Sequence, residues 1–143
     1  RLASEGAQVL LFGRDQARLD AAVAACGDLA SGAVLDVAVA ADGLDALATM
    51  TELTPDLVLT DVTLKGELNG RDVVERIRID FAYGKRRLPV LVMTGDTNPR
   101  NQSELLRAGA NDLVQKPIEE RLLVTKVLFQ LRLARLEDQA VTL

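Results

Sequence analysis

Five short apolar runs alternate with segments of helical spacing along this chain of 143 residues. Apolar runs of this length, bounded by Gly, Pro or Asp, are typical of buried strands. When strands alternate with helices, each helix carries the chain back across the sheet, so that neighbouring strands lie parallel. The pattern therefore predicts an α/β domain. The expected strands comprise residues 8–12, 33–40, 56–60, 89–94 and 112–115.

The segments between the strands carry signals for helix starts and stops. Asp15 suits the N-cap of a first helix that ends at Gly27, and Pro99 suits the first turn of a helix that ends at Gly109. Right-handed crossovers then favour a flavodoxin-like, doubly wound sheet of five parallel strands in the order 2-1-3-4-5. The remaining expected helices span residues 44–53 and 71–81 and the stretch from residue 119 onward.

Composition narrows the class of protein. The chain is 48% hydrophobic and 27% charged, which indicates a globular fold, and its net charge of -4 argues against a nucleic-acid surface. A lone cysteine, Cys26, and the lack of histidine argue against a zinc site and an internal disulfide. With no membrane-length apolar stretch and no signal peptide, we expect a cytoplasmic protein. We expect residues 1–130 to form the domain and residues 131–143 a helical tail or linker.

Polar side chains follow three of the expected strands where each strand ends. Asp61 follows the third strand, Thr94 closes the fourth, and Lys116 follows the fifth. Because parallel strands deliver their carboxyl ends to one edge, we expect these three residues to converge there. A carboxylate at a buried strand end is costly to desolvate without a compensating partner. Each residue alone would pass for an ordinary capping or surface residue, so the prediction depends on the three together.

Several motifs in chain order resemble the receiver domain of bacterial response regulators. They comprise residues 55–61, 68–70, 88–95, 108–112 and 115–117, and the resemblance covers about residues 34 to 130. It implies that Asp61 accepts a phosphoryl group from a phosphohistidine on a histidine kinase or a phosphotransfer protein. It also implies that Thr94 is the switch hydroxyl and that Lys116 pairs with the acyl phosphate. The protein would thus be a phosphoacceptor rather than an enzyme, although it could dephosphorylate itself. The Lys116–Pro117 peptide bond would be cis, as in the family.

The same resemblance implies a Mg²⁺ site made of Asp15, Asp61 and the backbone carbonyl of Thr63. The family, however, usually has two acidic residues at the end of its first strand, and Gly13 and Arg14 stand at those positions here. Three outcomes are open. Arg14 points away while Asp15 binds the metal, the metal site is weakened or lost, or Arg14 pairs with Asp61 in place of the metal. Leu113 also replaces the aromatic residue usual in the fifth strand, so the familiar aromatic switch is absent.

Residues 1–40 resemble a different family, the short-chain dehydrogenases. The stretch 1–15 and the segments 17–19 and 35–37 carry this similarity, and an arginine at the position of Arg14 often accompanies NADP use there. No glycine-rich phosphate turn is present, and Tyr83 with Arg87 lacks the lysine of the Tyr-x-x-x-Lys pair. Two hypotheses follow: a chimera that joins a Rossmann-type piece to a receiver, or a naturally divergent receiver.

Three functions are thus compared. The first is a receiver module of two-component signalling, and the second is a degenerate or engineered chimeric α/β module without phosphotransfer. The third, an NADP-binding fragment, depends on residues 1–40 alone. The basic run 85–87 is expected to be a solvated loop, with partner docking as the alternative. The last helix leaves a homodimer open, and neither nucleic acid nor a membrane is an expected partner.

Overall fold

The computed structural model describes residues 7–12, 35–40, 42–53, 55–62, 69–80 and 88–142. The first expected helix, between Asp15 and Gly27, lies outside these residues. The strands are β1 (Ala7–Phe12), β2 (Leu35–Ala40), β3 (Leu57–Asp61), β4 (Val90–Thr94) and β5 (Asp112–Gln115). The helices are α2 (Gly43–Leu53), α3 (Gly70–Asp80), α4 (Pro99–Ala108) and α5 (Glu120–Thr142).

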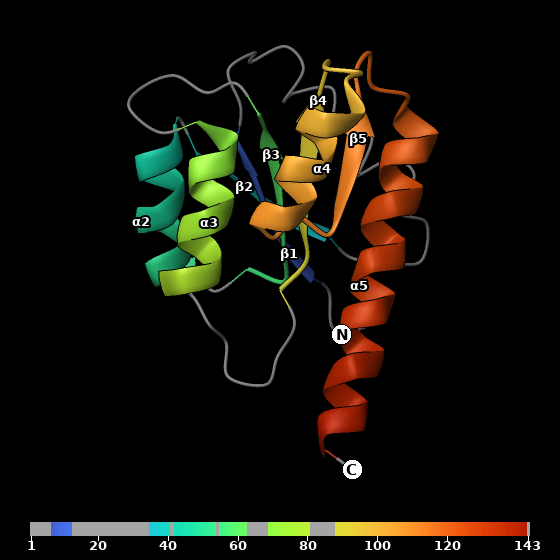
Figure 1. The fold of residues 1–143 in the computed structure, drawn as a ribbon. Helices are drawn as coiled ribbons and strands as arrows, with labels where there is room; N and C mark the ends of the chain where they lie inside the picture. Colours follow the sequence, from blue (N-terminus) through green and yellow to red (C-terminus); the bar gives the residue numbers. More distant parts are fainter. Residues whose placement is uncertain are drawn as a thin grey trace.

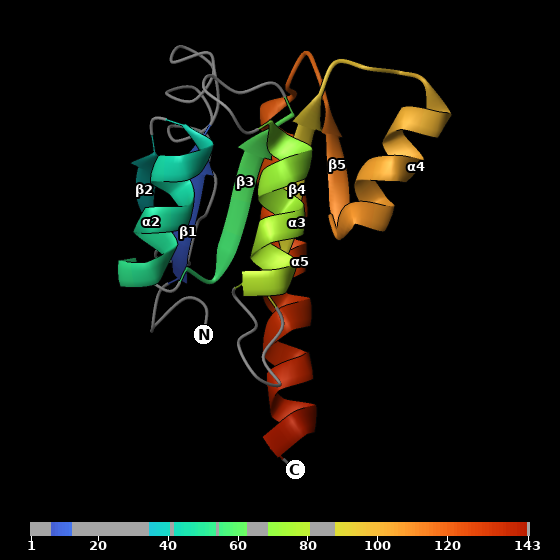
Figure 2. The same cartoon turned by 60° about the vertical axis from the view of Figure 1, so that its left-hand side comes forward.

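The strands form one parallel sheet with the order β2-β1-β3-β4-β5. Figures 1 and 2 show α2 and α3 over one face of the sheet and α5 over the other. The predicted α/β receiver-type architecture is therefore confirmed. Strand bounds differ from the expected ones by small amounts; β3, for instance, includes Asp61 itself as its last residue.

Residues of β3 alternate between two hydrophobic cores. Leu57 and Leu59 pack with residues of α5, such as Leu123, while Val58 packs with residues of α2 and α3, such as Met50. Because both faces of the sheet are covered, β3 and β4 are buried along their whole length. This double coverage explains why these strands appear in the sequence as continuous apolar runs rather than alternating ones.

Arg78 of α3 forms hydrogen bonds at the end of the sheet that lies opposite to Asp61. Its guanidinium donates to the carbonyls of Leu88 (2.7 Å) and Gly109 (2.8 and 3.0 Å) and to the side-chain oxygen of Asn111 (2.6 Å). The same Asn111 oxygen accepts from the backbone N–H of Val90 at 2.8 Å. One half-buried side chain thus joins α3 to the start of β4 and to the turn before β5.

α5 is a single continuous helix of 23 residues. Glu119 caps it, since its carboxylate accepts from the backbone N–H groups of Arg121 (3.2 Å) and Leu122 (2.7 Å). The helix continues well past the sheet at its C-terminal end (Figures 1 and 2). Within the described part of the chain, no helix has the length and apolar content that crossing a membrane would need.

Candidate functional site

The ends of β3, β4 and β5 lie side by side, as the sequence predicts. The backbone of Asp61 is in register with Met93, and the N–H of Val62 donates to the Met93 carbonyl at 3.0 Å. The N–H of Lys116 donates to the carbonyl of Thr94 at 2.8 Å. Asp61, Thr94 and Lys116 are thereby fixed at one edge of the sheet by the sheet's own backbone hydrogen bonds.

Asp61 and Lys116 form a buried ion pair. The Lys116 Nζ lies 2.5 Å from Asp61 Oδ1, and the two side chains are only 15% and 6% exposed, respectively. A buried carboxylate needs such a partner, because removing it from water is otherwise costly. The Lys116–Pro117 peptide bond is cis. The structure therefore brings together two of the three residues singled out from the sequence, distant along the chain, in direct contact.

Thr94 is also buried, but its hydroxyl faces the loop between β4 and α4. The Thr94 Oγ1 accepts from the backbone N–H of Asp96 at 3.0 Å. The Asp96 carboxylate in turn accepts from the N–H of Asn98 (2.8 Å) and the side-chain amide of Asn101 (2.6 Å). These two hydrogen bonds lower the pKa of Asp96 below its usual value of 3.8. A small polar network thus sets where the Thr94 hydroxyl points.

Gln102 ties the same loop to α4 and β5. Its side-chain amide donates to the Asp96 carbonyl at 2.9 Å and to the Gln115 side-chain oxygen at 3.1 Å. Asp96, Asn101 and Gln102 were not predicted from the sequence as site residues. The available signal was the cluster of polar residues directly after an apolar strand that ends in Thr94.

Gly70 allows α3 to begin directly against the backbone of Asp61. A Cβ at this position would lie 2.3 Å from the Asp61 carbonyl oxygen and 2.7 Å from the Val62 Cα, where no atom fits. The Gly70 N–H also donates to the Val62 carbonyl at 2.9 Å. The motif at residues 68–70 is therefore explained by close backbone approach.

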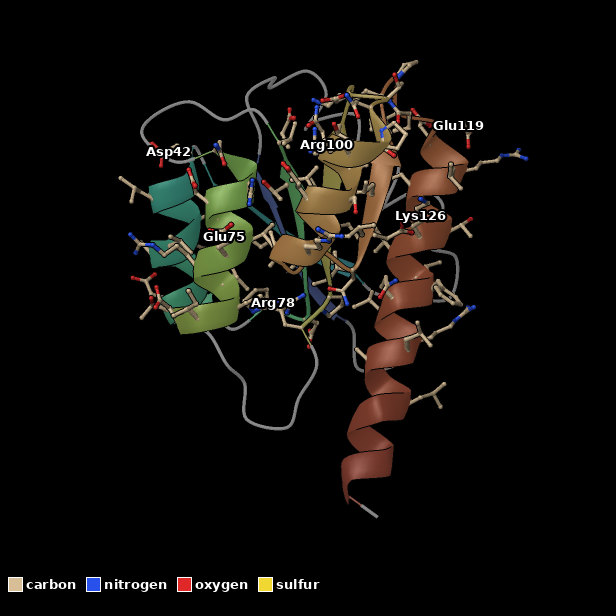
Figure 3. All side chains as sticks on the ribbon, in the orientation of Figure 1. Asp42, Glu75, Arg78, Arg100, Glu119 and Lys126 are labelled. Atoms are coloured by element: carbon tan, nitrogen blue, oxygen red, sulfur yellow. The ribbon has the colours of Figure 1, made fainter. Side chains whose placement is uncertain are left out.

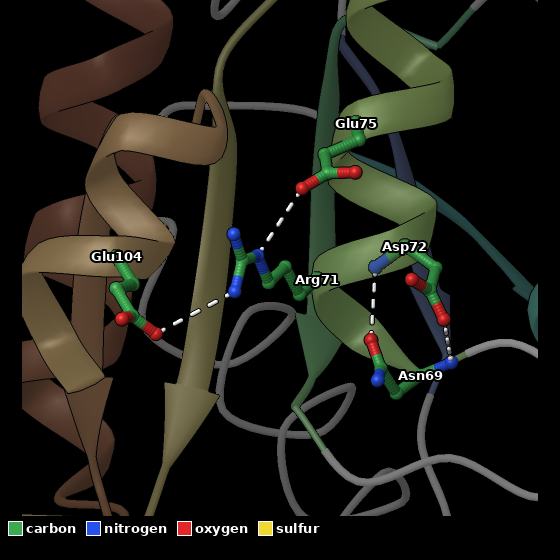
Figure 4. A network of polar contacts seen from close by, with 5 residues as sticks. All are labelled: Asn69, Arg71, Asp72, Glu75 and Glu104. Carbon is green, nitrogen blue, oxygen red and sulfur yellow. Dashed lines mark hydrogen bonds and ion pairs between the residues drawn. The ribbon is translucent and has the colours of Figure 1, made fainter.

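The start of α3 is capped by a reciprocal pair of hydrogen bonds, drawn in Figure 4. The Asp72 N–H donates to the Asn69 side chain (2.9 Å), and the Asn69 N–H donates to the Asp72 carboxylate (3.1 Å). Between these two residues in the chain, the Arg71 side chain reaches Glu75 at 3.1 Å and Glu104 of α4 at 3.5 Å. Arg71 therefore joins α3 to α4 on the exposed side of the site.

A pocket of about 240 Å³ opens between α3 and α4 beside this edge of the sheet. Its lining includes Val62, Thr94 and Asp96 from the ends of the strands, and Arg71 and Glu104 from the two helices. The switch residue proposed from the sequence thus borders a cavity. A side chain or loop can move into such a space without displacing the core.

Several residues singled out from the sequence lie outside the described part of the chain. They are Gly13, Arg14, Asp15, Thr63, Tyr83 and the basic run 85–87. Among the described residues, no group of three or more His, Cys, Asp or Glu is placed to hold a metal ion. Of the three proposed magnesium ligands, only Asp61 is described, and its carboxylate oxygens are of the kind that magnesium prefers.

Comparison with known proteins agrees with the geometry. The family model of the response regulator receiver domain matches residues 20–128. The chain belongs to this family. It is 39% identical over 104 residues to the DNA-binding response regulator MtrA of Mycolicibacterium smegmatis, covering 73% of this chain and 42% of that protein. It is also 35% identical over 96 residues to the transcriptional regulatory protein AfsQ1 of Streptomyces coelicolor, covering 67% and 40%. The receiver resemblance is thus confirmed.

Solved structures show the same fold. NtrX of Brucella abortus in complex with ATP has a TM-score of 0.82 at 24% identity and is matched over 95% of this chain and 29% of its own. The chemotaxis response regulator CheY4 of Vibrio cholerae has a TM-score of 0.71 at 22% identity, over 87% and 98%. The chain spans less than half the length of MtrA and AfsQ1. The short-chain dehydrogenase resemblance of residues 1–40 and the chimera remain hypotheses.

Proposed function

We propose that Asp61 is the phosphoacceptor of this receiver domain. The observation that carries the proposal is the Lys116 ammonium held 2.5 Å from the Asp61 carboxylate in a buried setting. A carboxylate oxygen attacks the phosphorus of a phosphohistidine on a histidine kinase or phosphotransfer protein. The P–N bond breaks, its electron pair stays on the imidazole, and an acyl phosphate forms.

Lys116 and Thr94 have separate parts in this proposal. The ammonium of Lys116 neutralises charge on the transferred oxygens, both during transfer and in the product. The Thr94 hydroxyl leaves the Asp96 N–H to hydrogen-bond the new phosphoryl group, so the loop after β4 changes position. Hydrolysis of the acyl phosphate by water returns the carboxylate and releases phosphate, which makes the switch reversible.

Receiver domains typically bind Mg²⁺ at the acidic site around the phosphoacceptor aspartate. Its proposed ligands here are Asp61, Asp15 and the carbonyl of Thr63, and it would supply further positive charge at the phosphoryl oxygens. If Arg14 repels the metal, Arg14→Asp should raise magnesium affinity in a titration followed by calorimetry. An unchanged affinity would exclude that role of Arg14.

The test of phosphorylation uses acetyl phosphate with Mg²⁺ and intact mass spectrometry. Wild-type protein should gain one phosphoryl group, and peptide mapping should place it on Asp61. Asp61→Asn should gain none, while Asp56→Asn, a matched change at a buried aspartate before the same strand, should still be labelled. Labelling that persists in Asp61→Asn would refute the assignment.

Two alternative functions can be distinguished from phosphoryl transfer by experiment. The Gly13-Arg14 departure favours an α/β module that binds partners without phosphotransfer, and such a module would gain no phosphoryl group at saturating acetyl phosphate. The similarity of residues 1–40 to dehydrogenases favours an NADP-binding fragment, and a fluorescence titration with NADPH that shows no binding would exclude it.

The partners follow from the family. We propose a histidine kinase or phosphotransfer protein as the phosphoryl donor. The relatives MtrA and AfsQ1 are a DNA-binding and a transcriptional regulator by name, so an output region of that kind is our proposal for the whole protein. We also propose that two copies associate through the last helix.

A further inference from the structure

A series of hydrogen bonds joins the end of β4 to the end of β5 through the first turns of α4. The Thr94 hydroxyl accepts from the Asp96 N–H at 3.0 Å, and the Asp96 carbonyl accepts from the Gln102 side-chain amide at 2.9 Å. The same amide donates to the Gln115 side-chain oxygen at 3.1 Å, and the Gln115 amide donates to the Lys116 carbonyl at 3.4 Å. The residues at the two ends, Thr94 and Lys116, both belong to the candidate site.

Backbone carbonyls set the orientation of both glutamine amides in this series. A carbonyl can only accept a hydrogen bond, so the Gln102 nitrogen must face the carbonyl of Asp96. For the same reason, the Gln115 nitrogen must face the carbonyl of Lys116. The Gln115 oxygen is then left to accept from Gln102, whose amide nitrogen uses both of its hydrogens. A side chain without N–H groups therefore cannot take the place of Gln102.

Gln102 lies where the loop after β4, the start of α4 and the end of β5 meet. It belongs to the first turns of α4, whose N-cap is Asn98, and Figure 3 labels Arg100 at this end of the helix. Gln102 also lines the pocket of about 240 Å³, together with Thr94 and Asp96. The loop therefore has space to move into, and the hydrogen bonds of Gln102 oppose that movement.

Movement of the Thr94 hydroxyl toward Asp61 interrupts this series of hydrogen bonds. When the loop shifts, Gln102 can stay with Gln115 and release the Asp96 carbonyl, or it can follow the loop and release Gln115. One hydrogen bond of Gln102 is lost in both cases. The shifted position of the loop therefore carries a cost that its position in the structure, the resting position, does not.

We propose that Gln102 is a positioning residue that holds the loop after β4 in its resting position by joining it to Gln115. The proposal rests on the function proposed above, in which the Thr94 hydroxyl moves to the phosphoryl group on Asp61. Because the hydrogen bonds of Gln102 favour the resting position, they oppose phosphorylation by the same free energy. A hydrogen bond of typical net strength corresponds to about a fivefold change in that equilibrium.

Amide hydrogen exchange measured by NMR tests the resting protein without any phosphoryl group. Gln102→Met keeps the length of the side chain and removes its donors, so the Asp96 N–H should exchange about fivefold faster than in wild type. Ser103→Met, a change at an exposed position of the same helix, is the control and should leave this rate unchanged. The N–H groups of Val62 and Lys116, which donate to carbonyls of β4, should be unaffected in both variants. An unchanged Asp96 rate in Gln102→Met would overturn the proposal.

Titration with beryllofluoride and Mg²⁺ tests the link to the phosphoryl site, because this ion imitates a phosphoryl group on an aspartate without covalent transfer. Gln102→Met and Gln115→Met should each lower its dissociation constant about fivefold. The double variant should gain no more, since either change already breaks the connection. Damage to the fold would weaken binding, so tighter binding distinguishes positioning from a purely structural role. Unchanged or weaker binding in Gln102→Met would exclude the role of Gln102.

This proposal and the proposed phosphoryl transfer can fail separately. Labelling of wild type by acetyl phosphate reports on Asp61 alone. If wild type takes no label and binds no beryllofluoride, phosphoryl transfer is excluded, and the exchange rate of the Asp96 N–H then decides whether Gln102 holds the loop. If wild type is labelled but exchange and binding are the same in Gln102→Met, the role of Gln102 is excluded and phosphoryl transfer stands.

Discussion

At the scale of single residues, the pairing of Asp61 with Lys116 links stability to function. Because the Asp61 side chain is only 6% exposed, removing the Lys116 ammonium takes a cation away from a buried carboxylate. We expect Lys116→Met to lower the free energy of unfolding by about 2 to 4 kcal/mol in urea denaturation, and to slow labelling by acetyl phosphate. The double variant with Asp61→Asn should recover much of that stability. Equal losses in the single and double variants would show that the pair is not coupled.

Position 70 has no room for a side chain, so only glycine fits there. In Gly70→Ala, the added Cβ would collide with the backbone at Asp61 and Val62. We expect a loss of about 1 to 3 kcal/mol in unfolding free energy and slower phosphorylation, since the strand end itself must shift. Gly95→Ala is the matched control on the neighbouring loop, because its Cβ would find nothing nearer than the Lys116 Cβ at 4.0 Å. Similar effects at both glycines would contradict this explanation.

At the scale of elements, the loop between β4 and α4 should respond to acid. The pKa of Asp96 is lowered in the folded protein by hydrogen bonds from the Asn98 N–H and the Asn101 amide. Its contribution to stability is therefore fully present above the unfolded value of about 3.8 and is lost as the pH falls through the folded value. Urea midpoints measured from pH 6 to 2 should fall less steeply at the acid end in Asp96→Ala than in wild type. Parallel pH profiles would show that Asp96 adds nothing to this dependence.

α3 depends on Arg78 for its attachment to the far end of the sheet. The guanidinium fork contacts carbonyls on two separate segments at once, a geometry that a lysine cannot reproduce. We expect Arg78→Lys to cost about 2 kcal/mol in unfolding free energy. Arg76→Lys on the same helix is the control. Its ion pair with Asp80 is exposed and long, at 3.8 Å, and the change should cost less than about 0.5 kcal/mol. Equal costs would remove Arg78 from this role.

At the scale of the whole molecule, the sequence predicted those features that follow from local pattern. Apolar runs and helix stops located the described strands and helices, and parallel strands explain why Asp61 and Lys116 meet. The contacts of Arg78 and the direction of the Thr94 hydroxyl could not be predicted, because each depends on which loops meet in three dimensions. The Asp96–Asn101 network was missed for the same reason. Arg14, Asp15 and Thr63 lie outside the described residues, so the metal site remains a prediction.

The division of the chain at residue 130 also remains a prediction, and α5 offers a way to test it. The helix crosses this position without a break, and Leu131 and Ala134 beyond it are buried, at 4% and 7% exposure. Deleting residues 131–143 should therefore remove core contacts and lower the unfolding free energy by about 2 to 5 kcal/mol, as for a large-to-small change at a buried leucine.

Deleting only residues 137–143 keeps Leu131 and Ala134 and is the control for that experiment. Both deletions should be measured at a concentration where wild type sediments as a monomer, because association of two copies through α5 would add its own stability. Under that condition the short deletion should match wild type in urea. If the long deletion also had the unfolding free energy of wild type, the domain would end near residue 130. The second half of α5 would then be a linker whose contacts with the core add no stability.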